Sequence, residues 1–395
     1  MLLPVVRLKI PRHSRHPWIY RKMLQLPRGV ELVAGSLVEV RDRDGGRVGE
    51  AFYHPDNTIA IRLLTSHPDE KVDSLFLRRR LSYARDLREG ILRLPETTDS
   101  WRLVNAEADL LPGLVVDKYA DVLLIQPFSA GWLYLMDWLV DGLRELYPAS
   151  RPVVRADPGA AQKEGVSFAK LEAQYPPPDR VVISENNVRY QVDFQSGHKT
   201  GFFLDQRDSR SRVGSLARGR RVLDLFSYSG GFSLAAWRGG ATAITAVDLD
   251  EKALAVAKEN ASLNQAGEAI RFRHQDAFMV LREVAGKGGR RDFDFIVLDP
   301  PKLARGKEEV EEALKSYRDL NRLAANALPA GGLLLSSSCS GAVSLERWRQ
   351  AVRQGVAEAG RGLTVFLEAG PGADHPVAGD FPQGRYLKTL FARIE

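Results

Sequence analysis

The chain has 395 residues, with 56 Lys and Arg residues against 50 Asp and Glu residues and a formal net charge of +6. This length suffices for two or three domains. The sequence contains no run of about 18 apolar residues, so no membrane-spanning helix is expected. The N-terminus lacks the basic lead and long apolar centre of a secretory signal, and a single cysteine excludes a disulfide framework and a cysteine-based structural metal site. We therefore expect a cytoplasmic protein without a metal.

The first 50 residues carry most of the net positive charge. They hold 10 Lys and Arg residues against 5 acids, whereas the rest of the chain is near balance. The segment from Lys9 to Lys22 also mixes cations with aromatic side chains such as Trp18 and Tyr20. Because cations neutralise phosphate and aromatic faces stack on bases, this segment predicts an RNA partner. A merely solvated basic face is the alternative.

Residues 33–61 predict a small β unit. Leu37 to Arg41 alternates between apolar and polar residues, Asp44-Gly45-Gly46 is typical of a hairpin turn, and Val48 to Tyr53 forms the returning strand. With Ala34 to Val38 leading into Gly49 to Tyr53, the unit resembles a PUA domain, a small β-barrel that binds RNA. The resemblance implies that residues 1–70 form an RNA-binding domain.

Residues 71–190 predict a compact central α+β domain. The expected elements are helices over Phe76–Leu92 and Ala130–Leu146, a strand over Val153–Arg155, and hairpins over Leu114–Gln126 and Val181–Phe194.

A strand, a turn and a helix follow one another over residues 222–237. Val222 to Phe226 is a short apolar run broken by one acid, which predicts a buried parallel strand. Ser227 to Gly231 is small and flexible, and a helix is expected from Phe232. This succession forms the entry to a nucleotide-type site, because glycine lets the backbone approach a ligand closely. The dinucleotide fingerprint G-x-G-x-x-G is absent, and an ordinary tight turn is the alternative.

Three later stretches predict strands that end in acids. They are residues 243–250 with Asp248, residues 271–277 with Asp276, and residues 293–301 with Asp299 before two prolines. Asp248 lies 24 residues after Asp224 (248 − 224), about where a second strand carries a carboxylate that binds a ribose. Each acid alone is more often a helix cap. Together they line the crevice where open α/β sheets bind ligands.

The order of these motifs resembles the class I S-adenosylmethionine-dependent methyltransferases. The resemblance implies a Rossmann-like α/β domain over residues 191–395. It implies that Asp248 binds the ribose hydroxyls, that Leu249 packs on the adenine, and that Asp276 and Ala277 border the adenine. The turn that would face the methionine part of the cofactor contains Asp224, Phe226, Ser227, Tyr228 and Gly230.

Further stretches extend the resemblance to essentially the whole chain. They are Asn105–Tyr119, Gly197–Arg207, Asp299–Lys302, Ser336–Ser340 and Gly372–Pro376. Together they are similar to the RlmI-like family of bacterial 23S rRNA cytosine-5 methyltransferases, which contain a PUA domain, a central α+β domain and a methyltransferase domain. The resemblance implies S-adenosylmethionine as the cofactor and 23S rRNA or a large-subunit precursor as the partner. It also implies that Phe203, Gln206 and Asp299 border the cofactor.

The chemistry of cytosine predicts a covalent route. Carbon 5 is a poor nucleophile until a thiolate adds to carbon 6, which needs a cysteine at the end of a strand. Leu333 to Cys339 predicts such a strand, and Cys339 is the only cysteine of the chain. A lone cysteine is usually a small buried hydrophobe. The serines around Cys339 and its place at a strand end favour the nucleophile.

Two further roles complete the predicted mechanism. Asp299 is expected to hydrogen-bond the base and to favour protonation of its ring nitrogen. A base must then remove the proton of carbon 5, and Asp374 and His375 are candidates, with a structural His375 as the alternative. We predict an RNA cytosine-5 methyltransferase without DNA or a membrane as partner, and a homodimer stays open. Methylation of a base nitrogen and an RNA-binding assembly factor with a vestigial cofactor site also stay open.

Overall fold

The computed structural model describes residues 3–12, 14–27, 29, 31–65, 67, 69–194, 201–286 and 292–395. The chain divides into two compact units. The first contains residues 1–183, 193–199 and 373–384, and the second contains residues 184–192, 200–372 and 385–395. The late segment 373–384 therefore packs with the N-terminal part of the chain.

The first unit begins with a six-stranded sheet in the order β2-β6-β5-β4-β1-β3. Its strands are β1 (Val5–Leu8), β2 (Trp18–Tyr20), β3 (Leu24–Gln25), β4 (Leu37–Arg41), β5 (Arg47–Tyr53) and β6 (Ile59–Leu63). The predicted β4–β5 hairpin is confirmed, and its turn is held by Asp42, whose Oδ1 accepts from Gly46 N at 2.7 Å and Asp44 N at 3.0 Å. Alternating apolar residues of these strands form a separate small core.

A four-stranded sheet in the order β10-β9-β8-β7 forms the rest of the first unit. Its strands are β7 (Ser100–Asn105), β8 (Leu114–Tyr119), β9 (Val122–Pro127) and β10 (Arg151–Val154), and its helices are α1 (Ser74–Arg85), α2 (Trp132–Leu146), α3 (Pro158–Lys163) and α4 (Ala169–Gln174). The helix predicted over residues 76–92 is α1 continued by a π-helical turn at Asp86–Ile91. Phe76 and Leu81 of α1 and Trp132 of α2 lie in one core with the sheet.

The hairpin predicted around two asparagines is confirmed. It consists of β11 (Arg180–Glu185) and β12 (Val188–Asp193). Asn186 and Asn187 have φ angles of 51° and 60°, the left-handed pair that a two-residue turn between twisted strands requires.

The second unit contains a seven-stranded sheet in the order β15-β14-β13-β16-β17-β19-β18. Its strands are β13 (Arg221–Leu225), β14 (Ala243–Asp248), β15 (Ile270–His274), β16 (Phe295–Leu298), β17 (Leu333–Ser338), β18 (Leu363–Ala369) and β19 (Lys388–Ile394). β19 runs antiparallel to β17 and β18, whereas β13 to β17 run parallel to one another. This order confirms the predicted Rossmann-like α/β fold.

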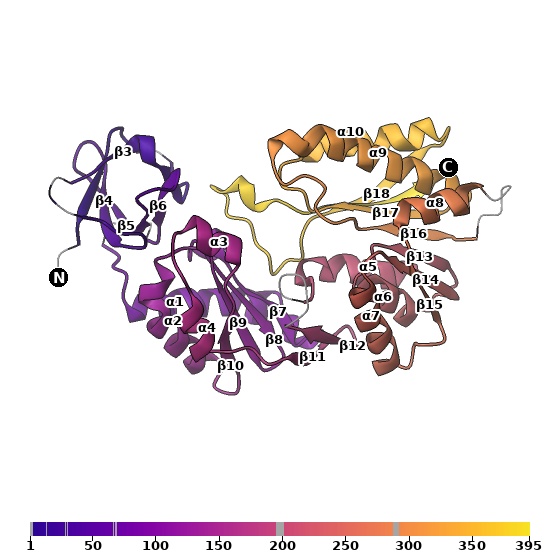
Figure 1. Ribbon diagram of the computed structural model, residues 1–395, viewed down its shortest axis with the longest axis horizontal. Coiled ribbons are helices and arrows are strands. Elements are labelled where there is room, and N and C mark those ends of the chain that lie inside the picture. Colours follow the sequence, from indigo (N-terminus) through magenta and orange to yellow (C-terminus); the bar gives the residue numbers. More distant parts are fainter. Residues whose placement is uncertain are drawn as a thin grey trace. The chain divides into compact units, whose positions relative to one another are not determined.

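Helices cover both faces of this sheet. Figure 1 shows α5 (Arg207–Leu216), α6 (Gly231–Arg238) and α7 (Glu251–Leu263) below it and α8 (Ala277–Gly286), α9 (Val310–Ala327) and α10 (Leu345–Glu358) above it. The parallel strands all point the same way, so their carboxyl ends share one edge. Two predicted strand ends were wrong: Phe226 follows β13, and β15 ends two residues before Asp276, because the turn and the helix cap begin there.

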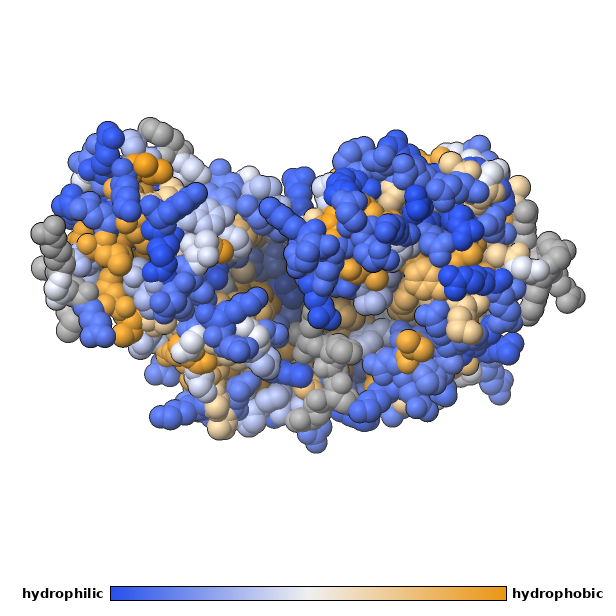
Figure 2. Space-filling model, turned by 45° about the horizontal axis from the view of Figure 1, so that its top comes forward, coloured by the Kyte–Doolittle hydropathy of each residue, from blue (hydrophilic) through white to orange (hydrophobic). Residues whose placement is uncertain are grey.

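The molecular surface is mostly hydrophilic on the face drawn in Figure 2, where hydrophobic patches are separated by hydrophilic residues. Among the helices of the described residues, none combines the length and the apolar character that crossing a membrane requires.

Candidate active site

The turn after β13 has a strained backbone. Phe226 and Tyr228 have positive φ angles of 64° and 48°, a region that costs a residue with a Cβ about 1–2 kcal/mol. Gly230 has a φ of 82°, and a Cβ there would lie 3.2 Å from Cβ of Ala257 in α7. Strain concentrated in this way is typical of ligand sites, because the loop is shaped for contact rather than for its own stability.

The Asp224 carboxyl at the end of β13 is fully buried. Its Oδ2 accepts hydrogen bonds from Ser233 N (2.9 Å) and Ser233 Oγ (2.6 Å) in α6. Burial, together with the charge of Asp248, raises the pKa of Asp224 from 3.8 to about 7.

Some buried polar atoms of this region have no partner among the described residues. They include Asp224 Oδ1, Ser227 Oγ and Gln206 Oε1. A buried polar group left without a hydrogen bond costs about 1–3 kcal/mol. These atoms fit the predicted cofactor, because the amino and carboxylate groups of its methionine part can supply the missing partners.

Asp248 stands at the end of β14, beside the turn. Its Oδ2 accepts from Tyr228 N at 2.8 Å and its Oδ1 accepts from Asp250 N at 2.9 Å, which fixes the direction of the carboxylate. The next residue, Leu249, is 66% exposed. An oriented carboxylate followed by an exposed apolar side chain suits a ribose and the flat face of a base, as predicted for these two residues.

Asp276 and Ala277 begin α8. The Oδ1 of Asp276 accepts from Met279 N at 3.0 Å, so this acid caps the helix, and Ala277 is buried. A cap and a ligand contact are compatible, because a carboxylate has further lone pairs.

Asp299 and Gln206 lie together at the end of β16. Gln206 Nε2 donates to Asp299 Oδ1 at 2.8 Å. Burial, with smaller contributions from the charges of Asp205 and Asp224, raises the pKa of Asp299 from 3.8 to about 7. The Asp299 carboxyl is thus poised to exchange a proton near neutral pH.

Phe203 precedes Gln206 and is 37% exposed. Its ring contacts that of Tyr228, with 5.3 Å between centroids, and its carbonyl accepts from Arg210 Nη1 at 2.8 Å. Phe203 therefore contacts the turn, Gln206 contacts Asp299, and their place beside the cofactor stays a prediction. The preceding part of the predicted stretch, Gly197 to Thr200, lies outside the described residues.

Cys339 directly follows β17 and is partly exposed. Its Sγ donates to the carbonyl oxygen of Pro300 at 3.9 Å. The one cysteine of the chain is therefore next to the Asp-Pro-Pro loop that carries Asp299.

Three residues that the sequence analysis did not assign surround Cys339. Ser340 Oγ accepts from Leu303 N at 3.0 Å and from Ala304 N at 3.1 Å, and it lies 3.1 Å from the hydroxyl oxygen of Tyr317. Lys388 donates to the Ser340 carbonyl at 2.9 Å. The Ser336–Ser340 run signalled Ser340, whereas Tyr317 in α9 and Lys388 in β19 have no local sequence signal.

His375 belongs to the first unit, whereas the residues described above belong to the second. It is buried, and its Nδ1 lies 3.0 Å from Asp374 Oδ1. Asp374 also accepts from Arg102 N through Oδ2 and from Arg88 Nη2 through its carbonyl, both at 2.8 Å. These contacts favour a structural role, and the assignment of His375 or Asp374 as a base stays a prediction.

The predicted RNA-binding segment has two kinds of aromatic side chain. Trp18 is engaged within the first unit, since its Nε1 donates to Glu107 at 2.8 Å and its ring contacts Phe381 with 4.7 Å between centroids. Tyr20 is exposed, as are the cations Lys9, Arg15 and Lys22. Stacking on a base is therefore open to Tyr20 rather than to Trp18.

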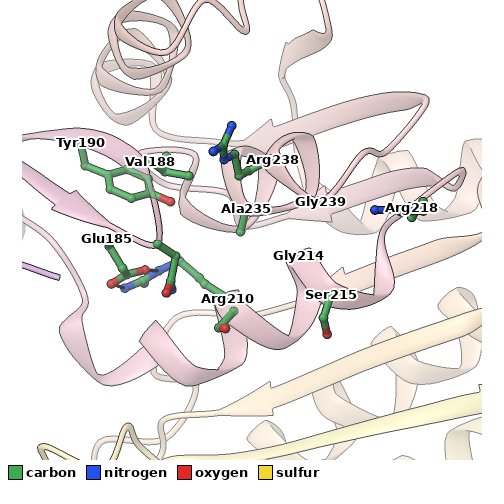
Figure 3. A pocket seen from close by; sticks show the side chains of 12 residues that line it. Glu185, Val188, Tyr190, Arg210, Gly214, Ser215, Arg218, Ala235, Arg238 and Gly239 are labelled. Carbon is green, nitrogen blue, oxygen red and sulfur yellow. Dashed lines mark hydrogen bonds and ion pairs between the residues drawn. The ribbon is translucent and has the colours of Figure 1, made fainter. Parts of the chain in front are cut away.

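A separate hollow of about 350 Å³ lies between the β11–β12 hairpin and helices α5 and α6. Figure 3 shows the buried ion pair of Arg210 and Glu185 at one side of it and the side chains of Arg218 and Arg238 at others. None of the predicted site residues lines this hollow.

Comparison with known families supports a methyltransferase domain and a PUA-like domain. A family of S-adenosylmethionine-dependent methyltransferases matches residues 172–350, and a PUA-like domain family matches residues 12–66. The dependence on S-adenosylmethionine and the PUA-like character of the N-terminal sheet are therefore confirmed.

Whole-chain relatives are also found. The chain is 41% identical over 387 residues to ribosomal RNA large subunit methyltransferase I of Tolumonas auensis, covering 96% of this chain and 95% of the relative. It is 39% identical to the protein of the same name from Aeromonas hydrophila, with the same coverage. Among solved structures, the methyltransferase SMU.776 complexed with SAH is 22% identical, with full coverage of both chains and a TM-score of 0.79, which supports the fold.

Proposed function

We propose, since this chain belongs to the ribosomal RNA large subunit methyltransferase I family, that it methylates carbon 5 of a cytosine in 23S ribosomal RNA. It is an S-adenosylmethionine-dependent methyltransferase of large-subunit ribosomal RNA. The proposal adds the base, the atom and a covalent route through Cys339. The observation that carries it is the contact between the chain's one cysteine and the Asp-Pro-Pro loop.

S-adenosylmethionine supplies an electrophilic methyl group when it is bound. Asp248 would hold the ribose hydroxyls, because its carboxylate keeps lone pairs beyond its two backbone hydrogen bonds. Leu249 would pack on the adenine. The partnerless atoms of Asp224, Ser227 and Gln206 would bind the polar end of the methionine part.

Cys339 supplies the nucleophile. Its thiolate forms a bond from Sγ to carbon 6 of the cytosine, and the electron pair of the 5,6 double bond becomes available at carbon 5. That pair would bond to the methyl group as the bond between the methyl group and the sulfonium sulfur breaks and leaves its electron pair on sulfur. A base removes the proton of carbon 5, and the electrons of that C–H bond re-form the double bond. The C6–Sγ bond breaks and returns the electron pair to sulfur.

Asp299 supplies the proton that this addition needs. A carboxyl group with a pKa of about 7 is partly protonated at neutral pH, so it can donate to the ring nitrogen that gains electron density when carbon 6 is attacked. Asp299 takes this proton back when the C6–Sγ bond breaks. Gln206 Nε2 donates a hydrogen bond to Asp299 Oδ1 at 2.8 Å, which leaves the other carboxyl oxygen for the cytosine.

The N-terminal sheet would bind the RNA. Its exposed cations Lys9, Arg15 and Lys22 suit phosphates, and the exposed Tyr20 ring suits stacking on a base. Residues 1–70 would thus bind the RNA substrate. The proposed α+β domain of residues 71–190 and the proposed methyltransferase domain of residues 191–395 come after them in the chain.

The substitution Cys339→Ala tests the covalent route. It removes one sulfur from a partly exposed position, so the fold and the affinity for S-adenosylmethionine should be retained while methyl transfer is lost. Bisulfite sequencing of 23S rRNA from cells with wild-type or variant protein reports the modified cytosine. An unchanged bisulfite signal with the variant would rule out the covalent route through Cys339.

An RNA that contains 5-fluorocytosine provides a second readout. Carbon 5 of this base has no removable proton, so the wild-type protein should form a covalent complex that survives denaturing electrophoresis, and Cys339→Ala should not. Calorimetric titration of the wild-type protein with S-adenosylmethionine separates the remaining alternative, because an assembly factor with a vestigial site gives no binding heat.

A further inference from the structure

Lys388 is a buried lysine beside the end of β17. It begins β19, where it pairs with Ser338, the residue before Cys339, and it is only 6% exposed. A lysine that is almost fully buried is rare unless its charge is paired, because removing an ammonium group from water is costly.

The Lys388 ammonium group donates to three backbone carbonyls. The acceptors are Ser340 O and Val343 O, both at 2.9 Å, and Tyr386 O at 3.0 Å. These bonds use all three N–H groups of the ammonium and tie β19 to the loop that follows Cys339.

The three carbonyl groups accept the hydrogen bonds of Lys388, but they carry no net negative charge that would pair with its positive charge. No carboxylate of the described residues lies within 4.0 Å of its Nζ. Burial lowers the pKa of Lys388 to about 8, and the charge of Cys339 opposes this shift. Lys388 is therefore still mainly cationic at pH 7, and a negative charge on Cys339 would interact favourably with it.

The other ionisable groups around Cys339 disfavour a negative sulfur. Tyr317 of α9 and Asp299 of the loop after β16 contribute no positive charge, and the charges of Cys339 and Asp299 both raise the pKa of Tyr317. Lys302 of the same loop is a cation, but its side chain is exposed. Lys388 is thus a buried positive group that can favour the thiolate.

We propose that Lys388 is a positioning residue for the nucleophile: its ammonium group fixes the loop after Cys339 and stabilises the Cys339 thiolate. The catalytic meaning of this role rests on the proposed function. The electrostatic part does not, because it concerns only the loss of the Cys339 Sγ–H proton to water.

The single cysteine of the chain makes the test direct. Alkylation of the full-length protein by iodoacetamide, followed as a function of pH, reports the thiolate fraction of Cys339 alone. Lys388→Met keeps the length of the side chain and removes its charge, so alkylation at pH 7 should slow about tenfold as the thiolate population falls. Lys388→Arg keeps the charge and should restore most of the rate.

Tyr317→Phe is the matched control. It removes the hydroxyl that contacts Ser340 Oγ and leaves every positive charge in place. The pH profile of alkylation should therefore stay close to that of the wild-type protein, whereas a loop held merely by its contacts would respond to both substitutions.

One outcome overturns the proposal: a folded Lys388→Met protein with the wild-type alkylation profile. The covalent mechanism fails separately, if Cys339→Ala still methylates RNA, and that result would leave the alkylation profiles unchanged.

Discussion

Two carboxyl groups of the second unit share an unusual electrostatic environment. Asp224 and Asp299 are shifted to a pKa of about 7, mainly by burial, and the charge of Asp224 adds to the shift of Asp299. Asp248 differs because both of its oxygens accept backbone N–H bonds. The end of the sheet thus provides a fixed carboxylate for a neutral ligand group and carboxyl groups that exchange protons near pH 7.

Asp299→Asn should change how stability depends on pH. Because the folded-state pKa lies above the ordinary value, the native state keeps a proton that the unfolded state has lost between pH 3.8 and about 7. The contribution of Asp299 to the free energy of unfolding is therefore largest below this range and falls as the pH rises through it. Relative to the wild-type protein, Asp299→Asn should gain on the order of 1–3 kcal/mol between pH 5 and pH 8.

Urea unfolding of both proteins at pH 5, 6, 7 and 8 and constant ionic strength checks this expectation. The exposed Asp292, substituted by Asn, serves as the control and should show the same pH dependence as the wild-type protein. A constant difference between Asp299→Asn and wild type would mean that Asp299 titrates at its ordinary pKa.

Among the helices, α5 and α6 cross in close contact, and each of them is joined to a part of the candidate site. A Cβ at Gly239, the cap of α6, would lie 1.9 Å from the carbonyl oxygen of Gly214 in α5. The two helices can approach this closely only because Gly239 has no side chain. α5 follows Gln206 and α6 begins at the strained turn, so the crossing sets the distance between two parts of the site.

Gly239→Ala should therefore lower the free energy of unfolding by about 1–3 kcal/mol, because the helices must separate to admit a methyl group. Gly267→Ala is the matched control, since a Cβ at that position meets no atom within 4 Å. Urea unfolding measures both variants. Equal midpoints for Gly239→Ala and wild type would show that the helices can shift without cost.

At the scale of the molecule, the N-terminal sheet and the α+β part of the first unit share an apolar contact. Phe52 of β5 and Trp132 of α2 have ring centroids 5.3 Å apart, and a Cβ at Gly131 would lie 2.1 Å from the Phe52 ring. Deleting residues 1–70 would expose Trp132, so surface substitutions test RNA binding more cleanly than truncation.

Replacing Lys9, Arg15 and Lys22 together by Ser should weaken RNA binding and leave the affinity for S-adenosylmethionine unchanged. If each cation neutralises one phosphate, the slope of log K against log salt should become shallower by about 2, at roughly 0.7 per phosphate of single-stranded RNA. Filter binding across a salt series measures the slope. Lys163→Ser with Lys170→Ser, at exposed positions of α3 and α4, is the control. Equal slopes for the triple variant and wild type would remove the basic segment from the interface.

Local sequence patterns are sufficient to predict the sheet edge at which the candidate site lies. Short apolar runs, one containing Asp224 and two leading to Asp248 and Asp299, predict parallel strands, and parallel strands bring their carboxyl ends to one edge. The position of Cys339 follows from the same rule, because it comes directly after such a strand. These inferences need only local periodicity and the common direction of the strands.

Which residues from distant parts of the chain surround these positions depends on tertiary packing and could not be predicted from local patterns. Lys388 reaches the loop after Cys339 because β19 inserts antiparallel between β17 and β18, a pairing that no local pattern encodes. Trp18 contacts Phe381, which the sequence separates by most of the chain. The physical reason is that a side chain's local sequence fixes its strand or helix, whereas its charge environment and its free surface depend on packing between segments far apart in the chain.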